Sequence, residues 1–161
     1  MNIEQQIQAV CEKFQIVGEY QSFGVVSSGH INNSYQVFFS RDGVVKDYIL
    51  QKINTYVFHD PIAMMENISS VTEYIRARIK QKQGTAKRNV LHYLTTADGQ
   101  YYTILDDGSF WRCCRFINNS VSFICFISCL GQILCHEFVV LFNINTKQFI
   151  CRYFKNMANR R

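Results

Sequence analysis

Residues 34–53, SYQVFFSRDGVVKDYILQKI, decide the fold, because they read as two strands joined by one tight turn. Residues 34–39 and 44–53 are rich in β-branched and aromatic side chains, which favour strands. Between them lies Arg41-Asp42-Gly43, a turn signal, since Asp-Gly tolerates the positive φ values that a two-residue hairpin requires. The sequence therefore predicts two neighbouring antiparallel strands here.

A helix and a further strand precede this hairpin. Residues 3–14 carry apolar side chains with the spacing of one helical stripe, namely Ile3, Ile7, Val10, Cys11 and Phe14. Residues 20–26 read as a strand, and a small polar loop over residues 27–33 separates it from the strand that begins at Ser34. We expect these two strands to pair around the loop as a hairpin with a long tip.

A long helix and more strands follow. Asp60 is predicted as the N-cap and Pro61 as the first helical residue. Apolar residues at every third or fourth position carry the helix to about Lys82, namely Ile62, Met65, Ile68, Val71, Ile75 and Ile79. Strands are predicted over residues 90–96, 100–105 and 110–117, with turns at Asp98-Gly99 and Asp106-Asp107-Gly108. The order predicts an α+β fold, an antiparallel five-stranded sheet with one long helix.

Composition excludes several classes of protein. The chain has 161 residues, 48% hydrophobic and 18% charged, which suits one core of ordinary size. Residues 1–123 carry 12 Lys and Arg against 11 Asp and Glu, whereas residues 124–161 carry 5 against 1, so no nucleic-acid-binding face is expected. The N-terminus has no basic region followed by an apolar run. We therefore expect a cytoplasmic protein whose 7 cysteines form no disulfides.

Five short motifs, in this order along the chain, carry a resemblance to a known family. They are GHINNSY at residues 29–35, YILQKIN at 48–54, VF at 57–58, MENI at 65–68 and WRCCRFI at 111–117. Together they resemble the aminoglycoside/choline phosphotransferase superfamily, which has a protein-kinase-like fold, and within it they are most similar to the N-acetylhexosamine kinase group. The resemblance covers residues 1–123 and implies the small N-terminal lobe of that fold.

The resemblance implies an ATP site with three parts. The first is the tip loop, whose hydroxyls, amides and backbone N–H groups suit a triphosphate; its residues are Ser28, Gly29, His30, Asn32, Asn33 and Ser34. The second is the third strand, where a cation is expected to hold the phosphates and pair with an acid of the long helix. Lys52 is favoured as this cation, and Gln51 stays open, because adjacent strand residues face opposite sides. The helix acid is Glu66 or Glu73.

The third part is the end of the strand over residues 110–117, which resembles the strand that leads into the adenine-binding hinge. The resemblance implies that the main chain of this segment bonds to the adenine edge and that Arg115, Phe116 and Ile117 lie beside the base. For Trp111, a place in the core and a ligand role both stay open. The family's catalytic Asp and its Mg²⁺-binding Asp belong to a larger second lobe, and no Asp follows residue 123 here. No catalytic or metal-ligating residue is therefore assigned.

The implied reaction transfers the γ-phosphate of ATP to a hydroxyl of an amino sugar with Mg²⁺. We expect residues 1–120 to hold the nucleotide side of the site and to be inactive without a catalytic lobe. Binding of the amino sugar would require the same lobe. Residues 121–161 form a hydrophobic and then basic tail, and we hypothesise that it is translated out of frame. Two alternatives stay open: a non-enzymatic nucleotide- or partner-binding module, and a small membrane-associated protein held through residues 121–142.

Overall fold

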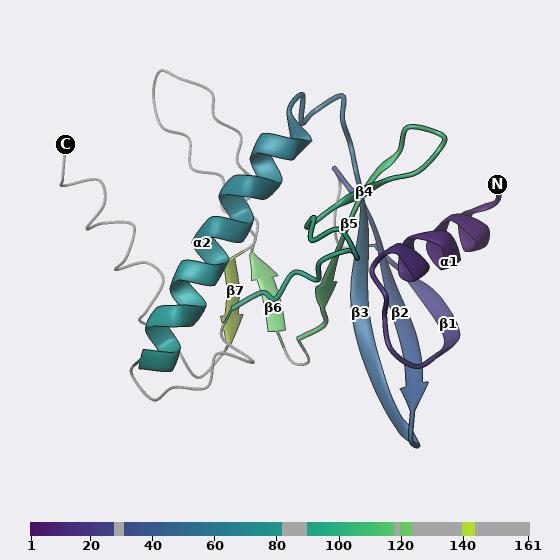
Figure 1. Cartoon of the computed structure of the whole chain (residues 1–161), viewed down its shortest axis with the longest axis horizontal. Helices are drawn as coiled ribbons and strands as arrows, with labels where there is room; N and C mark the ends of the chain where they lie inside the picture. The colour runs from purple at the N-terminus through teal and green to yellow at the C-terminus, as the bar shows by residue number, and fades with distance from the viewer. Residues whose placement is uncertain (28–30, 82–89, 118–119, 124–139, 144–161) are drawn as a thin grey trace.

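The computed structural model describes residues 1–27, 31–81 and 90–117, together with the backbone of residues 120–123 and 140–143. Its main sheet has five antiparallel strands in the order β1-β2-β3-β5-β4 (Figure 1). The strands are β1 Glu19–Val26, β2 Asn33–Arg41, β3 Val44–Ile53, β4 Thr103–Ile104 and β5 Phe110–Arg115, and the helices are α1 Ile3–Lys13 and α2 Pro61–Gln81. The predicted fold class, a five-stranded antiparallel sheet with one long helix, is confirmed.

Local sequence signals set the start of both helices. Gln5 N donates to the Asn2 side chain at 2.8 Å, and Asn2 N donates to the Gln5 side chain at 2.9 Å. These bonds satisfy N–H groups that the start of a helix leaves without partners. At α2, Ala63 N donates to Asp60 Oδ1 at 3.0 Å and Pro61 is the first helical residue, as predicted.

The tight turn between β2 and β3 forms where the Asp-Gly pair predicts it. The φ angle is 52° at Asp42 and 74° at Gly43, the left-handed values that a two-residue hairpin needs. The turn fixes a register in which Ser34 lies opposite Gln51. Because side chains alternate along a strand, this register also fixes which residues share a face of the sheet.

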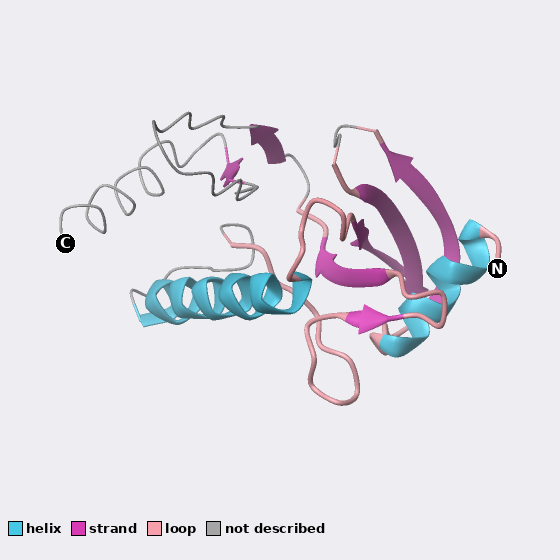
Figure 2. Cartoon of the chain, turned by 90° about the horizontal axis from the view of Figure 1, so that it is seen from above, coloured by secondary structure: helices cyan, strands magenta, loops and turns pink. Residues whose placement is uncertain are grey.

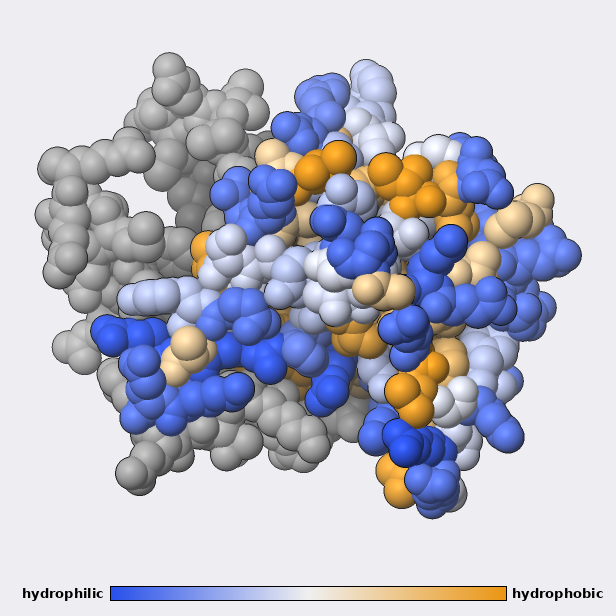
Figure 3. All heavy atoms as spheres, in the orientation of Figure 1, coloured by the Kyte–Doolittle hydropathy of each residue, from blue (hydrophilic) through white to orange (hydrophobic). Residues whose placement is uncertain are grey.

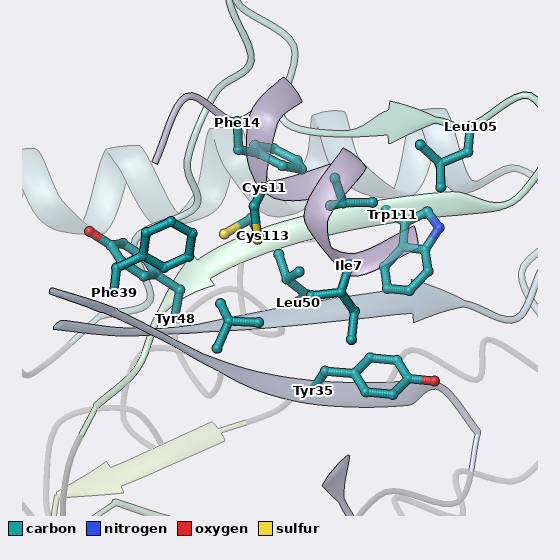
Figure 4. Packing of buried hydrophobic residues seen from close by; sticks show 12 residues of the cluster. Ile7, Cys11, Phe14, Tyr35, Phe39, Tyr48, Leu50, Leu105, Trp111 and Cys113 are labelled. Carbon is teal, nitrogen blue, oxygen red and sulfur yellow. The ribbon is translucent and has the colours of Figure 1, made fainter. Parts of the chain in front are cut away.

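The two helices lie on opposite sides of the sheet (Figures 1 and 2), and we call these sides the α1 face and the α2 face. The core on the α1 face consists of Ile7, Val10, Cys11, Phe14, Tyr35, Val37, Phe39, Tyr48, Leu50, Leu105, Trp111 and Cys113 (Figure 4). The core on the α2 face is smaller and consists of Ile53, Met65, Tyr93, Phe110 and Cys114. Of the two roles left open for Trp111, the structure shows the place in the core.

Residues 90–96 do not form the predicted strand. Tyr93 makes only an isolated bridge to β5. The chain then closes on itself, because Thr96 N donates to Gln100 O at 2.9 Å and Gln100 N donates to Thr96 Oγ1 at 3.2 Å. This closure satisfies locally the backbone groups that a strand would pair with a neighbour. The strand predicted over residues 100–105 is correspondingly reduced to β4.

The tail contributes two described strands, β6 Ser120–Phe123 and β7 Val140–Asn143, which pair antiparallel. The rest of the tail, residues 124–139 and 144–161, lies outside the described residues, and with it most of the stretch considered as a membrane span. Within the ranges that the structure describes, no helix has the length and apolar character needed to cross a membrane.

Exposed apolar side chains on the described surface are scattered. Val44 and Val45, beside the β2–β3 turn, and Val25 of β1 are more than half exposed. Figure 3 shows small apolar groups separated by hydrophilic ones on the face toward the viewer. Scattered exposure of this kind is ordinary for a protein surface and indicates no binding site by itself.

Gly18 provides a first test of how the chain enters the sheet. Its φ is 125°, and a Cβ at this position would lie 2.7 Å from the backbone oxygen of Ser40. We expect Gly18→Ala to lower the free energy of unfolding by about 1–3 kcal/mol, because neither the backbone nor its neighbour accommodates the methyl group. Urea unfolding measures the change.

The matched control is Gly24→Ala in β1. No described atom lies within 4 Å of the Cβ position at Gly24, and its φ is not in the left-handed region. The free energy of unfolding should stay the same or rise by about 0.4–1 kcal/mol, because alanine has less freedom in the unfolded chain. Equal losses at Gly18 and Gly24 would contradict the described entry into β1.

Candidate functional site

One end of the main sheet gathers the segments that were assigned to phosphate binding. β1 and β3 end there, and β2 and β5 begin there. Asn32, buried just before β2, accepts a hydrogen bond from Asn54 N, just after β3, at 2.8 Å. This bond ties the base of the tip loop to the end of β3. Ser28, Gly29 and His30 lie outside the described residues, and Asn33 is exposed at the start of β2.

A polar row crosses three strands at this end, and it consists of Ser34, Gln51 and Arg112. Ser34 of β2 lies opposite Gln51 of β3, which lies opposite Arg112 of β5. Gln51 Nε2 donates to Ser34 Oγ at 2.9 Å, and Arg112 Nε donates to Gln51 Oε1 at 2.9 Å. Arg112 Nη1 also lies 3.7 Å from Met65 Sδ of α2. The polar row is therefore on the α2 face.

The positive charge of Arg112 has no carboxylate partner in the described part of the chain. Only 5% of its surface is exposed, and its contacts are the Gln51 amide, the Met65 thioether and the Tyr93 ring, whose centroid is 5.5 Å from the guanidinium carbon. Burial raises the pKa of Tyr93, which Arg112 lowers only in part, so the phenol is neutral near pH 7. A guanidinium stays protonated in proteins. Among the described residues, the row thus carries a buried positive charge with no acid beside it.

Lys52 lies on the α1 face, so the prediction that it pairs with an acid of the long helix is wrong. Its Nζ is 3.3 Å from Gln6 Oε1, 3.8 Å from Asp107 Oδ2 and 5.7 Å from the centroid of the Trp111 ring. The physical reason is strand alternation, because Lys52 follows Gln51 and must take the opposite face. Gln51, which the sequence analysis left open, takes the α2 face.

Asp107 explains why Lys52 is held on that side. The side chain and backbone N–H of Ser109 both donate to Asp107, and these bonds, followed by the charge of Lys52, lower the pKa of the Asp107 carboxyl. Ser109 Oγ also accepts a hydrogen bond from Trp111 Nε1 at 2.8 Å. The turn before β5, the Trp111 indole and the Lys52 ammonium group are therefore in mutual contact on the α1 face.

The two candidate acids of the long helix do not reach Lys52. Glu66 is exposed on α2 and makes no ion pair with any residue that the structure describes. Glu73 pairs with Arg76 of the same helix at 3.3 Å. Toward the polar row α2 presents Met65 instead of an acid.

Arg115, Phe116 and Ile117 lie at the other end of β5. Arg115 is exposed, and its N–H donates to His92 O at 3.0 Å, while Phe116 N donates to Asp47 O at 3.1 Å. Phe116 is half-buried and Ile117 is buried. The first two backbone N–H groups are thus used within the fold, so a base lying against this segment would meet other main-chain groups or side chains.

The α2 face has space at Gly24, one residue pair along the sheet from the polar row. Gly24 of β1 lies opposite Gln36 of β2, two residues from Ser34, and therefore on the same face. No described atom comes within 4 Å of the Cβ position at Gly24, and Gln36 and Gln51 are only half-buried. The β1 residue opposite Ser34 itself is the half-buried Val26, and Arg112 lies two strands further from β1 than Ser34.

Arg112 is the residue of this site that sequence reasoning missed. The available signal was the run WRCCR, in which Trp111 and Cys113 are buried on the α1 face while Arg112 and Cys114 are buried on the α2 face. A charged residue in a strand that is buried on both faces is rare without a partner. Such a residue therefore indicates a site.

The described residues hold no preformed cluster of ligands for Mg²⁺. This ion is held by carboxylate and other oxygen ligands. Within the described ranges, no group of three or more His, Cys, Asp or Glu side chains comes together. In a comparison with known protein families, no family model matches the sequence.

Proposed function

We propose that residues 1–120 form the nucleotide-side lobe of an ATP-dependent sugar phosphotransferase of the N-acetylhexosamine kinase type. The observation that carries the proposal is the polar row at the end of the sheet where the tip loop begins. Ser34, Gln51 and Arg112 provide hydrogen-bond donors side by side on the α2 face, and Gln51 among them is half-buried. A triphosphate needs such donors from a flap and from the sheet beneath it.

The position of Phe116 and Ile117 favours a nucleotide over a small anion. These side chains lie at the far end of β5, and four residues of strand, roughly 13 Å, separate Phe116 from Arg112. A ligand with phosphates at one end and a flat base at the other would span both places. Three of the five motifs that resemble the phosphotransferase superfamily contain the polar row and these two side chains, namely GHINNSY at 29–35, YILQKIN at 48–54 and WRCCRFI at 111–117.

The proposed task of this lobe is to bind and orient the nucleotide. Phosphoryl transfer is catalysed almost entirely by positioning and by electrostatic stabilisation around the transferred group. The resemblance assigns Mg²⁺ binding and proton acceptance to acids of a second lobe, which would also hold the amino sugar. The polar row would fix the phosphates in the orientation that this second lobe requires.

Calorimetric titration of the full chain with ATP tests the proposal. We expect a Kd no tighter than roughly 100 μM, because one lobe offers one wall of a cleft that normally buries most of its ligand. That affinity corresponds to about 5.5 kcal/mol. Adenosine and inorganic tripolyphosphate should each bind more weakly than ATP, since each makes only part of the contacts.

Two results of this experiment would contradict the proposal. One is the absence of binding at an ATP concentration of several millimolar. The other is ATP binding that tripolyphosphate does not compete for, because the phosphates would then lie outside the site. In the same samples, transfer to N-acetylgalactosamine or N-acetylglucosamine should stay at background.

A further inference from the structure

We propose that Arg112, and not Lys52, is the cation of this chain that receives a phosphate group, with Gln51 and Ser34 as its neighbours in an anion site. The identity of the ligand as a nucleotide rests on the proposed function. The anion site itself is argued from the polar row alone, so the two proposals fail in different ways.

The first argument is the unbalanced charge. Arg112 is 5% exposed, and its described contacts are an amide, a thioether and an aromatic ring. Replacing a buried charge by a well-packed apolar residue is often neutral or stabilising, whereas a buried charge without a partner is costly. The guanidinium therefore reduces the stability of the free protein, and a bound anion would offset that cost.

The second argument is an excess of donors. Two N–H directions of the guanidinium are taken up by Gln51 Oε1 and by Met65 Sδ, and sulfur is a weak acceptor. The Ser34 hydroxyl accepts from Gln51, so its own hydrogen remains a donor, and the Gln51 amide keeps a second N–H. Three neighbouring side chains thus present donors in one place. A phosphate group supplies acceptors only, and arginine binds it with two parallel hydrogen bonds.

The third argument is the contrast with Lys52. The ammonium group of Lys52 already has Asp107 at 3.8 Å and the Trp111 ring beneath it, on the face that α1 covers. Arg112, 5% exposed beneath α2, has no acid beside it in the described part of the chain. Of the two cations at this end of the sheet, Arg112 is the one that an anion would neutralise.

The sharpest variant is Gln51→Glu in the full chain. It places a carboxylate where Gln51 Oε1 now accepts from Arg112 Nε at 2.9 Å, so the protein would neutralise its own guanidinium. Binding of ATP and of tripolyphosphate, measured by calorimetry at constant ionic strength, should weaken about 10- to 100-fold. The midpoint of urea unfolding should stay the same or rise. Gln6→Glu, which adds the same charge beside Lys52 on the α1 face, is the matched control and should leave the affinity within about threefold.

A second set of variants removes the cations. Arg112→Met keeps an apolar stem against Met65 and should lose anion binding without lowering the urea midpoint, because it removes a buried charge. Lys46→Met, on the exposed part of β3, is the control for the loss of one positive charge. Lys52→Met tests the competing assignment and should change the affinity by less than about threefold.

The outcomes separate the two proposals. Unchanged ATP binding in folded Gln51→Glu and Arg112→Met would overturn the anion site while leaving the nucleotide function standing, and so would a loss of binding in Lys52→Met alone. Tripolyphosphate binding that Arg112→Met abolishes, in a chain that does not bind ATP, would support the anion site and overturn the nucleotide function. No binding of either probe by the wild-type chain would overturn both.

Discussion

Replacing Trp111 by alanine is expected to lower the free energy of unfolding by about 3–5 kcal/mol, a large part of the total stability of a domain of this size. The indole is 0% exposed and packs against Tyr35, with 5.8 Å between ring centroids. Its Nε1 donates to Ser109 Oγ, and Lys52 lies over the ring. The substitution would leave a cavity between α1, β3 and β5. It would also remove the indole that contacts Ser109 and Lys52.

Urea unfolding followed by circular dichroism measures this loss. Fluorescence is unsuitable, because Trp111 is the single tryptophan of the chain and the variant lacks it. Tyr56→Ala is the control, because Tyr56 is 86% exposed and its loss should change stability by no more than about 0.5 kcal/mol. A loss of less than about 1 kcal/mol in Trp111→Ala would mean that α1 does not pack on β5 as described.

The parts of the fold that local chemistry decides could be predicted from the sequence. The bounds of β3 and the start of α2 agree with prediction, because an Asp-Gly turn and an Asp-Pro cap act within a few residues. Residues 90–96 could not be assigned in this way. Whether they form a strand depends on how they meet β5, and Thr96 and Gln100 close the chain before a regular ladder develops.

The candidate site shows the same limit. Strand alternation requires Gln51 and Lys52 to face opposite sides, but alternation alone cannot say which side α1 covers. That choice comes from long-range packing, namely Asp107 and Gln6 against Lys52 on one face and Met65 of α2 on the other. Charge alone therefore favoured Lys52 over Gln51 as the β3 residue that faces the long helix, and this choice was wrong. The site of Arg112 could not be predicted either, because its partners Met65 and Gln51 lie 47 and 61 residues away along the chain.

Raising the pH above about 9 is expected to destabilise the fold steeply, because three buried thiols stay protonated in it. Burial raises the pKa of Cys11 to about 12 and that of Cys114 to about 11, and it raises the pKa of Cys113 well above the usual value. In the unfolded chain these thiols ionise near about pH 8.5. Because the folded pKa values are the higher ones, the thiols contribute their full stability below about pH 8.5 and lose it as the pH rises toward about 11.

Within this window each thiol should remove about 1.4 kcal/mol per pH unit, so the three together remove about 4 kcal/mol between about pH 9 and pH 10. Urea unfolding across this range measures the slope, and Cys114→Ala should reduce it by about one third whatever its effect on stability at neutral pH. Alkylation followed by peptide mass spectrometry adds a direct readout. Cys11, Cys113 and Cys114 should react slowly in the native chain and quickly in urea, because only the thiolate is the nucleophile. Rapid native labelling of Cys113, or an unchanged slope in Cys114→Ala, would show that the sulfur atoms do not lie in the two cores described.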